Sequence, residues 1–397
     1  MIEKLPKLRS EIESELQSIL DFWAKNAVDL EQGGFVGKMD NEGIVYPDAE
    51  KGCVLNARIL WTFAAAYNKL GDPSHLALAE HAYNYIRDHF RDQKNGGVFW
   101  SVDAAGKPLN TRKQIYGLAF TIYGLSEFYQ KNKNQEALDF AIELFELIEK
   151  YSFDQKNGGY FEAFTESWQP LEDLRLSEKD RNDPKTMNTH LHIIEAYVNL
   201  YRVWPEKRVA GKIKHLLEIF EKHIIDPDNF HLKLFFNEKW ESQSRAISYG
   251  HDIEATWLLH EAAEVLDDQF LVDDWQEIAV KMSDAAAKGF MPDGSLIHEY
   301  DLATHHPDTH REWWVSAEGM VGFLNTYQIT EDESYLKRVF GLWTFIQKHL
   351  LDKEKGEWFW GVSDDYSKMK EDKIGFWKCP YHNARACMEI LKRTETD

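Results

Sequence analysis

The chain has 397 residues, enough for two or three domains or for one large closed architecture with a sizeable core. Its 46 Lys and Arg stand against 67 Asp and Glu, which gives a net charge of −21, and the acidic residues are spread along the chain. Nucleic acids and anionic membrane surfaces are therefore poor partners, because both bind clustered positive charge.

The sequence pattern argues against export and against membrane insertion. No run approaches the roughly 18 apolar residues of a spanning helix, and the first ten residues, MIEKLPKLRS, lack the apolar core of a signal peptide. The three cysteines, Cys53, Cys379 and Cys387, form no CxxC pair and no metal-ligand spacing, so we expect buried thiols. We expect a cytoplasmic protein.

A loop signature recurs six times along the chain. The clear copies are DLEQGGFVG (29–37), DQKNGGVFW (92–100) and DQKNGGYFE (154–162), and degraded copies lie at 226–236, 291–300 and 352–360. Successive copies are 63, 62, 70, 65 and 62 residues apart. Such a period fits two helices plus their loops.

Between the signatures the apolar spacing is helical, and two kinds of helix alternate. Amphipathic helices with one charged face are predicted at 7–26, 75–90, 135–150, 207–223, 271–288 and 333–349. Helices that are apolar nearly all round are predicted at 54–70, 115–129, 190–204, 252–266, 313–327 and 380–393. Because the second kind must be buried on both faces, the pattern predicts six outer and six inner helices.

Six helical hairpins can close into an all-α (α/α)6 barrel, with each Gly-rich signature forming a tight turn or a short β-hairpin. An open solenoid is the alternative. We favour closure because the chain begins with a lone outer helix and ends with a lone inner helix, and these two can pair to complete the ring. No Pro- or Ser-rich linker interrupts the series, so we expect one domain over residues 1–397.

In a closed barrel the N-terminal ends of the inner helices can meet at one mouth. Polar residues interrupt the apolar pattern near these ends in all six units: Asn56 and Arg58; Tyr116; Asn188, His190 and His192; His251, Asp252 and Glu254; Trp313, Trp314 and Glu318; and Tyr381, His382, Asn383 and Arg385. A single such residue is usually a satisfied core group. Recurrence at the same place in six units favours a shared cavity.

The histidines suggest acid–base chemistry more than metal binding. On a helix, residues at i and i+2 point about 200° apart, so His190 and His192 do not chelate one ion together. No carboxylate stands at an HExxH-like spacing, and we expect neither a metal nor another cofactor.

Two further histidines have the surroundings of general bases. His251 and Glu254 are at i and i+3, so the carboxylate is expected to orient the imidazole; a surface ion pair is the alternative. His382 follows Pro380, a residue favoured at the first helical position, which places this imidazole in the first turn of a helix. The helix dipole disfavours the imidazolium there, as it does at His251, so both side chains are predicted to be neutral.

Arg58 lies inside an apolar helix and therefore needs a strongly polar partner. A substrate oxygen that develops negative charge is one possibility, and a buried carboxylate is the other. The tryptophans Trp313, Trp314 and Trp377 fit a core, but Trp313 and Trp314 cannot both point inward from one helix. At least one of this pair is expected to line a rim or a cavity.

Five segments together resemble the cellobiose 2-epimerases, a group within the N-acylglucosamine 2-epimerase superfamily. They are KGCVLNARILW (51–61), KTMNTHLHIIEAY (185–197), SYGHDIEATWLL (248–259), WWVSAEGMVGF (313–323) and GFWKCPYHNARACMEI (375–390). The similarity extends over essentially the whole chain, and GHDIE and WKCPYHN are the motifs specific to this group.

The resemblance implies an (α/α)6 barrel enzyme that inverts C2 of the reducing-end glucose of β-1,4-linked disaccharides such as cellobiose and lactose, without a metal or nucleotide cofactor. By motif match, His251 and His382 are implied as the acid–base pair, with assistance from His192 and Glu254. The residues implied to hold the reacting sugar are Arg58, Tyr116, Asn188 and Trp377. Those implied to contact the second sugar unit are Asp180 and Trp314.

Three other functions stay open from the sequence. A mannose 2-epimerase or mannose isomerase of the same superfamily has the same histidines but acts on free monosaccharides. An (α/α)6 glycoside hydrolase needs two carboxylates that flank the scissile bond, whereas the inner helix starts carry mainly histidine. A catalytically silent sugar-binding solenoid leaves the positions of His251 and His382 unexplained. In each case the partner is a small sugar, and we expect a monomer or a weak homodimer.

Overall fold

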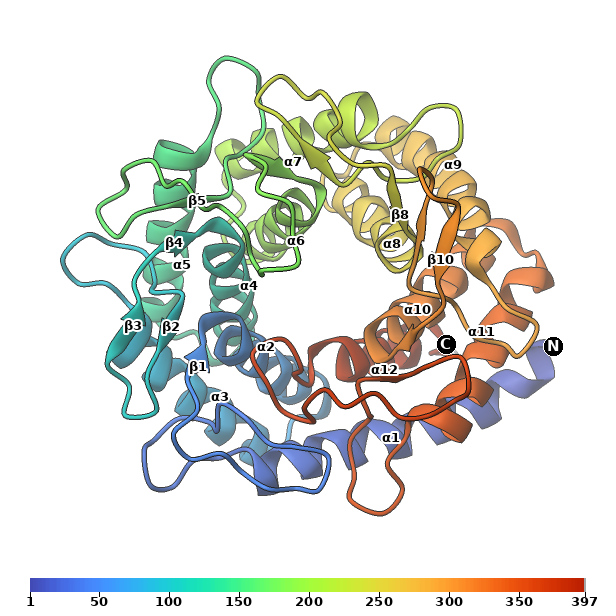
Figure 1. Ribbon diagram of the computed structural model, residues 1–397, viewed down its shortest axis with the longest axis horizontal. Coiled ribbons are helices and arrows are strands. Elements are labelled where there is room, and N and C mark those ends of the chain that lie inside the picture. The colour runs from blue at the N-terminus through green and yellow to red at the C-terminus, as the bar shows by residue number, and fades with distance from the viewer. Residues whose placement is uncertain (396–397) are drawn as a thin grey trace.

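The computed structural model describes residues 1–395, which form a ring of two concentric layers of helices (Figure 1). The inner helices are α2 (Cys53–Leu70), α4 (Ile115–Asn132), α6 (Met187–Val203), α8 (Tyr249–Glu264), α10 (Trp313–Thr330) and α12 (Tyr381–Arg393). The outer helices are α1 (Leu5–Asn26), α3 (Pro73–Tyr85), α5 (Gln135–Leu147), α7 (Lys207–Ile219), α9 (Gln269–Ala286) and α11 (Glu333–Phe345). The (α/α)6 barrel expected from the alternating helices is confirmed.

The ring closes as the two unpaired end helices suggest. Helix α12 packs against α10, α2 and α1. One tie across this junction is the guanidinium of Arg9, which donates a hydrogen bond to the carbonyl oxygen of Leu391 at 2.5 Å. The inner helices lie very close together: a Cβ at Gly124 would stand 2.8 Å from the carbonyl oxygen of Ala57 on the neighbouring helix. Closure of the ring therefore depends on small residues at such crossings.

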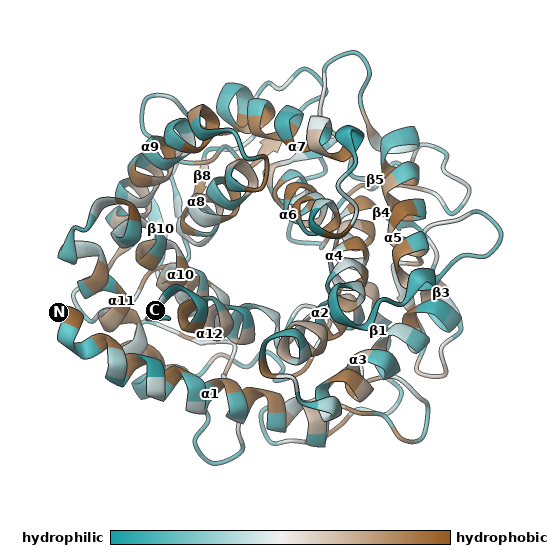
Figure 2. Cartoon of the chain, turned by 180° about the vertical axis from the view of Figure 1, so that it is seen from behind, coloured by the Kyte–Doolittle hydropathy of each residue, from teal (hydrophilic) through white to brown (hydrophobic). Residues whose placement is uncertain are grey.

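Polar and apolar residues are distributed as the two layers require. The outer helices carry hydrophilic residues on their outward sides (Figure 2). The inner helices are buried almost throughout: every residue of α2 from Cys53 to Ala66 is buried, and so is every residue of α10 from Trp313 to Thr326. No helix in residues 1–395 is both long enough and apolar enough to cross a bilayer.

Four outer helices end differently from the prediction. The sequence predicts uninterrupted helices to about residues 90, 150, 223 and 349, whereas α3, α5, α7 and α11 each pass into a five-residue π-helical turn. These turns are η2 (Ile86–Phe90), η3 (Ile148–Ser152), η4 (Phe220–Ile224) and η6 (Ile346–Leu350). Short 3₁₀ turns are η1 (Ile2–Lys4), before α1, and η5 (Ala287–Gly289), after α9. The wider π turns keep the apolar residues of these segments in the core.

Short antiparallel strands collect where the inner helices begin. The strands are β1 (Lys51–Gly52), β2 (Ser101–Val102), β3 (Pro108–Asn110), β4 (Lys113–Gln114), β5 (Ala163–Phe164), β6 (Lys185–Thr186), β7 (Phe235–Phe236), β8 (Ala246–Ser248), β9 (Glu299–Asp301), β10 (His306–Asp308), β11 (Arg311–Glu312) and β12 (Gly361–Val362). Their sheet orders are β1-β2-β3, β4-β5, β6-β7, β10-β9-β8 and β11-β12. Five of these strands run directly into an inner helix, so the small sheets fix the helix N-termini at one mouth.

The recurring loop signature has a structural explanation. In the second copy, Oδ1 of Asp92 accepts the backbone N–H groups of Lys94 and Asn95, and Oδ2 accepts the buried ammonium of Lys113 at 2.7 Å. The glycine pair after this turn, Gly96 and Gly97, has positive φ. The same acid–lysine pair recurs as Asp29 with Lys51, Asp154 with Lys185 and Asp352 with Lys373. In these four copies the signature thus holds its loop to the segment that leads into the next inner helix.

Candidate active site

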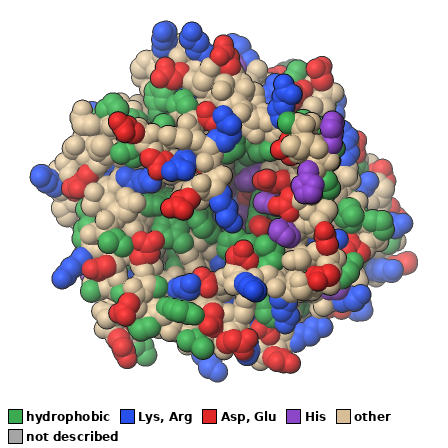
Figure 3. Space-filling view, viewed as in Figure 1, with side chains coloured by type: hydrophobic (Ala, Val, Ile, Leu, Met, Phe, Trp, Pro, Cys, Tyr) green, Lys and Arg blue, Asp and Glu red, His purple; other side chains and the backbone are tan. Residues whose placement is uncertain are grey.

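The mouth at which the inner helices begin is hollow at its centre, and histidine side chains gather on the side of β8 and β10 (Figure 3). A cavity opens there, and four polar side chains in its lining are those of Asp180, Asn188, His251 and Glu299. The carboxamide oxygen of Asn188 is buried and has no hydrogen-bond partner among the described residues. The cavity therefore offers a free acceptor beside an imidazole.

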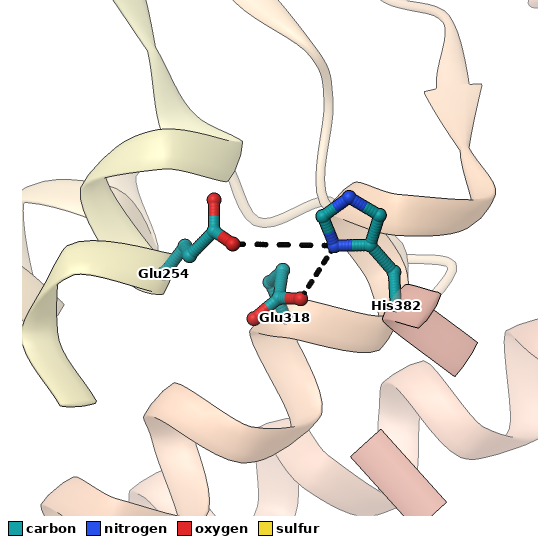
Figure 4. Close-up of side chains that lie close together, drawn as sticks. All are labelled: Glu254, Glu318 and His382. Atoms are coloured by element: carbon teal, nitrogen blue, oxygen red, sulfur yellow. Dashed lines mark hydrogen bonds and ion pairs between the residues drawn. The ribbon is translucent and has the colours of Figure 1, made fainter. Parts of the chain in front are cut away.

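His382 lies in the first turn of α12 with carboxylates behind it (Figure 4). Its Nδ1 is 2.7 Å from Oε1 of Glu318 on α10 and 4.0 Å from Oε1 of Glu254 on α8. Burial lowers the pKa of His382 to about 3 even though the Glu318 carboxylate favours the charged form. A neutral imidazole that donates from Nδ1 to Glu318 has its lone pair on Nε2.

His251 lies in the first turn of α8, and its hydrogen-bond partner is a hydroxyl instead of a carboxylate. Its Nδ1 is 2.8 Å from the hydroxyl of Ser248, the residue just before the helix. Burial lowers the pKa of His251 to about 3, and neighbouring histidines add to the effect. The lowered pKa values of His251 and His382 agree with the prediction that both side chains are neutral, and burial is the first cause of both shifts.

The expected pairing of His251 with Glu254 is wrong. The imidazole takes the hydroxyl of Ser248, which begins the helix, and Glu254 lies one turn deeper. There Oε1 of Glu254 accepts Nη2 of Arg385 at 2.8 Å. The i, i+3 spacing does produce a pair on the neighbouring inner helix, where Nδ1 of His192 is 2.8 Å from Oε2 of Glu195. A buried cation on another helix thus decides which glutamate faces which histidine.

His192 belongs to a group that fills the deep part of the mouth. Its ring lies edge-on to that of Tyr116, with the ring centroids 5.0 Å apart. The ring centroids of Tyr116 and Trp377 are 6.0 Å apart. The hydroxyl of Tyr116 accepts a hydrogen bond from Nη2 of Arg58 at 2.9 Å. Three residues predicted to hold the reacting sugar therefore lie together beside His192.

The buried partner expected for Arg58 is not a carboxylate. Within residues 1–395 its guanidinium has Tyr116 as a hydrogen-bond partner, lies over the ring of Phe120 at 4.2 Å, and has Sγ of Cys379 at 3.9 Å. Its Nε has no hydrogen-bond partner. Of the two alternatives left open by the sequence, the buried ion pair is excluded for the described residues, and a charged donor remains for a substrate oxygen.

The adjacent tryptophans point to different neighbours. Trp314 packs against His251, with ring centroids 4.7 Å apart, and against His382 at 5.8 Å. Its Nε1 donates to Oε2 of Glu312 at 2.6 Å. Trp313 faces Trp360 at 4.4 Å. Both tryptophans are buried, and Trp314 contacts both histidines that the sequence selects as bases.

The cluster of Glu254, Glu318 and His382 has the composition of a metal site, with the ligand atoms within 4.8 Å of one another. However, the oxygens that face His382 are already engaged: Nη2 of Arg385 lies 2.8 Å from Oε1 of Glu254 and 2.6 Å from Oε1 of Glu318. The guanidinium therefore occupies the position of the cation. This arrangement does not fit a metal ion unless Arg385 moves away.

Three site residues were missed by the sequence prediction. Glu195, Glu318 and Arg385 form the support behind His192 and His382. Glu318 and Arg385 were among the polar interruptions of the inner helices, but their partners come from other helices and cannot be found from spacing. Glu195 could have been found by applying to His192 the i, i+3 rule that was applied to His251.

Comparison with known proteins identifies the family. The family model described as N-acylglucosamine 2-epimerase matches residues 33–386. The chain belongs to this family. A cellobiose 2-epimerase of Bacteroides fragilis is 47% identical over 97% of the chain and 98% of that protein. A cellobiose 2-epimerase of Ruminococcus albus is 41% identical over 97% and 98%.

Solved structures of similar proteins have the same architecture. Cellobiose 2-epimerase from Bacillus thermoamylovorans superimposes with a TM-score of 0.93 at 40% identity over 98% of the chain and all of that structure. A family 76 glycoside hydrolase from a Bacteroides thetaiotaomicron strain shares the fold alone, with a TM-score of 0.68 at 13% identity over 96% and 77%. The N-acylglucosamine 2-epimerase family member described here is thus a sugar epimerase built on the barrel predicted from its helices.

Proposed function

We propose that the enzyme inverts C2 of the reducing-end glucose of β-1,4-linked disaccharides such as cellobiose and lactose. The observation that carries the proposal is the placement of two neutral imidazoles, His251 and His382, on different inner helices and against one tryptophan, Trp314. Proton removal and return on opposite faces of one carbon needs two such groups.

The chemistry requires the sugar ring to open before C2–H becomes acidic. One imidazole takes the C2 proton from the open-chain aldehyde, which gives a planar cis-enediolate. The other imidazole takes up a proton from solvent and delivers it as the imidazolium to the opposite face of C2, while the first imidazolium releases its proton to solvent. His192 and Glu254 assist: His192 adds a third imidazole beside Tyr116, and Glu254 stands behind His382. A proton returned to C1 gives a ketose.

Arg58 is the group proposed to stabilise the enediolate oxygen. It is a buried cation without a carboxylate partner in residues 1–395, so its attraction for a developing negative charge is not already satisfied. We assign Tyr116, Asn188 and Trp377 to the reacting sugar because Tyr116 is bonded to Arg58 and packs against Trp377, and because Asn188 lines the cavity. Each offers either a ring face or a free polar atom to a hexose.

The second sugar unit is assigned to Asp180 and Trp314. Asp180 lines the cavity that also contains His251, and Trp314 packs on His251. The relatives that are named cellobiose 2-epimerase, at 37 to 47% identity, support a disaccharide substrate. A D-mannose isomerase of Marinomonas mediterranea, at 22% identity over 96% of the chain, represents the monosaccharide alternative.

The deciding experiment incubates the purified enzyme with cellobiose, lactose, mannose or glucose and identifies the products by chromatography and NMR. We expect conversion of the two disaccharides to their 2-epimers, with or without EDTA in the buffer. Trp314→Ala should reduce turnover of cellobiose far more than turnover of mannose, because contacts to the non-reacting sugar supply remote binding energy. Turnover of mannose alone would favour the monosaccharide alternative, and a cleaved glycosidic bond would indicate a hydrolase.

A further inference from the structure

One buried guanidinium ties four inner helices together behind the active-site histidines. Arg385 of α12 is 1% exposed. Its Nη2 donates to Oε1 of Glu254 at 2.8 Å and to Oε1 of Glu318 at 2.6 Å, and its Nη1 contacts Oε1 of Glu195 and the hydroxyl of Tyr381. The three glutamates come from α8, α10 and α6, so a single side chain bridges elements that are far apart in the sequence.

Two of these glutamates are also the hydrogen-bond partners of histidines. Glu195 accepts Nη1 of Arg385 with Oε1 and faces Nδ1 of His192 with Oε2, at 2.8 Å. Glu318 faces both Arg385 and Nδ1 of His382 with Oε1. Arg385 is therefore linked to two imidazoles on opposite sides of the mouth, in each case through one glutamate. It makes no direct hydrogen bond with either imidazole.

The cluster has more carboxyl groups than cations, so the carboxyl groups differ in how readily they ionise. Three carboxyl groups share one guanidinium in a buried setting. Burial and the charge of Glu318 raise the pKa of Glu254 well above its usual range. Burial opposes ionisation of Glu318 as well, but Arg385 and the bond with His382 lower its pKa to about 2. Ionisation is thus disfavoured at Glu254 and favoured at Glu318, whose Oε1 faces the Nδ1 of His382 at 2.7 Å.

We propose that Arg385 is a positioning residue that fixes the tautomer of both His192 and His382, by holding Glu195 and Glu318 as ionised acceptors of their Nδ1–H groups. The inference rests on the proposed function for its activity readout only. With Nδ1 protonated, each imidazole presents the lone pair of Nε2, the atom that can take a proton from a substrate. Without the guanidinium, the glutamates gain protons and both histidines lose their fixed acceptors.

The first test compares Arg385→Met with Arg393→Met. Arg393 is on the same helix and has polar contacts of its own, with Oε2 of Glu389 at 3.2 Å and Oδ1 of Asn325 at 2.9 Å, at the end away from the histidines. Arg385→Met should lower kcat for cellobiose at least about a hundredfold with little change in KM, because proton-transfer groups act in the transition state. Arg393→Met should leave kcat within about twofold.

The pH profile separates positioning from simple loss of structure. The titratable or charged groups that face Arg385 and His382 are Glu195, Glu254, Glu318, Tyr123, Tyr381, Arg58, His192 and His251. Without Arg385 the proposal makes Glu318 take up a proton, which removes the carboxylate charge that raises the pKa of His382, so the acid limb of kcat/KM should move to lower pH. Added ethylguanidine should restore part of the activity of Arg385→Ala, and ethylammonium should not. An unshifted acid limb, or no rescue, would overturn the proposal.

A measurement on the unmodified enzyme covers the case in which the variants fail to fold. Long-range ¹H–¹⁵N spectra of enzyme labelled at histidine report the tautomer of each ring. His192 and His382 should both show protonated Nδ1 and unprotonated Nε2 at neutral pH. The opposite tautomer at either residue contradicts the role of Arg385 whatever the substrate is. If the tautomers are as expected but no sugar is epimerised, the proposed function fails and the inference about Arg385 stands.

Discussion

His382 and His251 have different hydrogen-bond partners, although both lie in the first turn of an inner helix, α12 and α8 respectively. His382 has an ionised carboxylate, Glu318, at 2.7 Å behind Nδ1, with Arg385 holding that carboxylate in turn. Among residues 1–395, His251 has the hydroxyl of Ser248 as its hydrogen-bond partner, at 2.8 Å. A carboxylate stabilises an imidazolium far better than a hydroxyl does. The imidazolium of His382 therefore has a charged hydrogen-bond acceptor, whereas the imidazolium of His251 has a neutral one.

The largest effects should follow from removal of the imidazoles themselves. His382→Ala and His251→Ala should each lower kcat for cellobiose by about a hundredfold or more, the lower end for a positioned acid or base. Circular dichroism should show an intact helical fold in both variants. Near-normal turnover in either variant would remove that histidine from the mechanism and end the comparison.

The partners of the two imidazoles provide a sharper test of the difference. Glu318→Gln should lower kcat more than tenfold, because it removes the charge that stabilises the imidazolium of His382. Ser248→Ala removes one neutral hydrogen bond worth about 1 kcal/mol and should cost less than about tenfold. The two kcat values, measured on the same substrate, decide the point. Equal losses of kcat would mean that Glu318 and Ser248 stabilise a proton on their histidines to the same extent.

Stability in acid should depend on the same histidines. Burial lowers the pKa of His382 from its ordinary value of 6.5 to about 3 in the folded enzyme, so the unfolded chain binds a proton that the folded chain excludes. This difference leaves stability unaffected above about pH 6.5 and lowers it as the pH falls from 6.5 toward 3. His382→Gln should flatten the fall in Tm between pH 6.5 and pH 4. A slope identical to that of the unmodified enzyme would show that this imidazole is not buried as a neutral group.

The architecture could be predicted because it depends on local periodicity. Inner helices such as α2 and α10 are apolar on all sides, outer helices have one charged face, and the loop signature marks each repeat. The ends of the outer helices could not be predicted, because a π turn differs from an α turn by one residue within the same apolar pattern. The single domain over 1–397, the cytoplasmic location and the oligomeric state stay predictions.

The site could be predicted residue by residue but not pair by pair. The polar interruptions of the inner helices selected His251, His382 and Arg58 correctly as neighbours of one mouth. The partner of His251 was predicted wrongly because spacing along one helix takes no account of Arg385, whose buried charge draws Glu254 away. Contacts between helices far apart in the sequence depend on ring closure, which local patterns do not specify.

The most direct test of the account is the fate of the C2 proton. The enzyme is incubated with cellobiose in D2O, and the recovered sugars are analysed by NMR. Two histidines acting through a planar enediolate should place deuterium at C2 of the epimer and none at C1, because imidazole protons exchange with solvent. An epimer without deuterium at C2, or deuterium mainly at C1 of a ketose, would contradict proton transfer by His251 and His382 on opposite faces of C2.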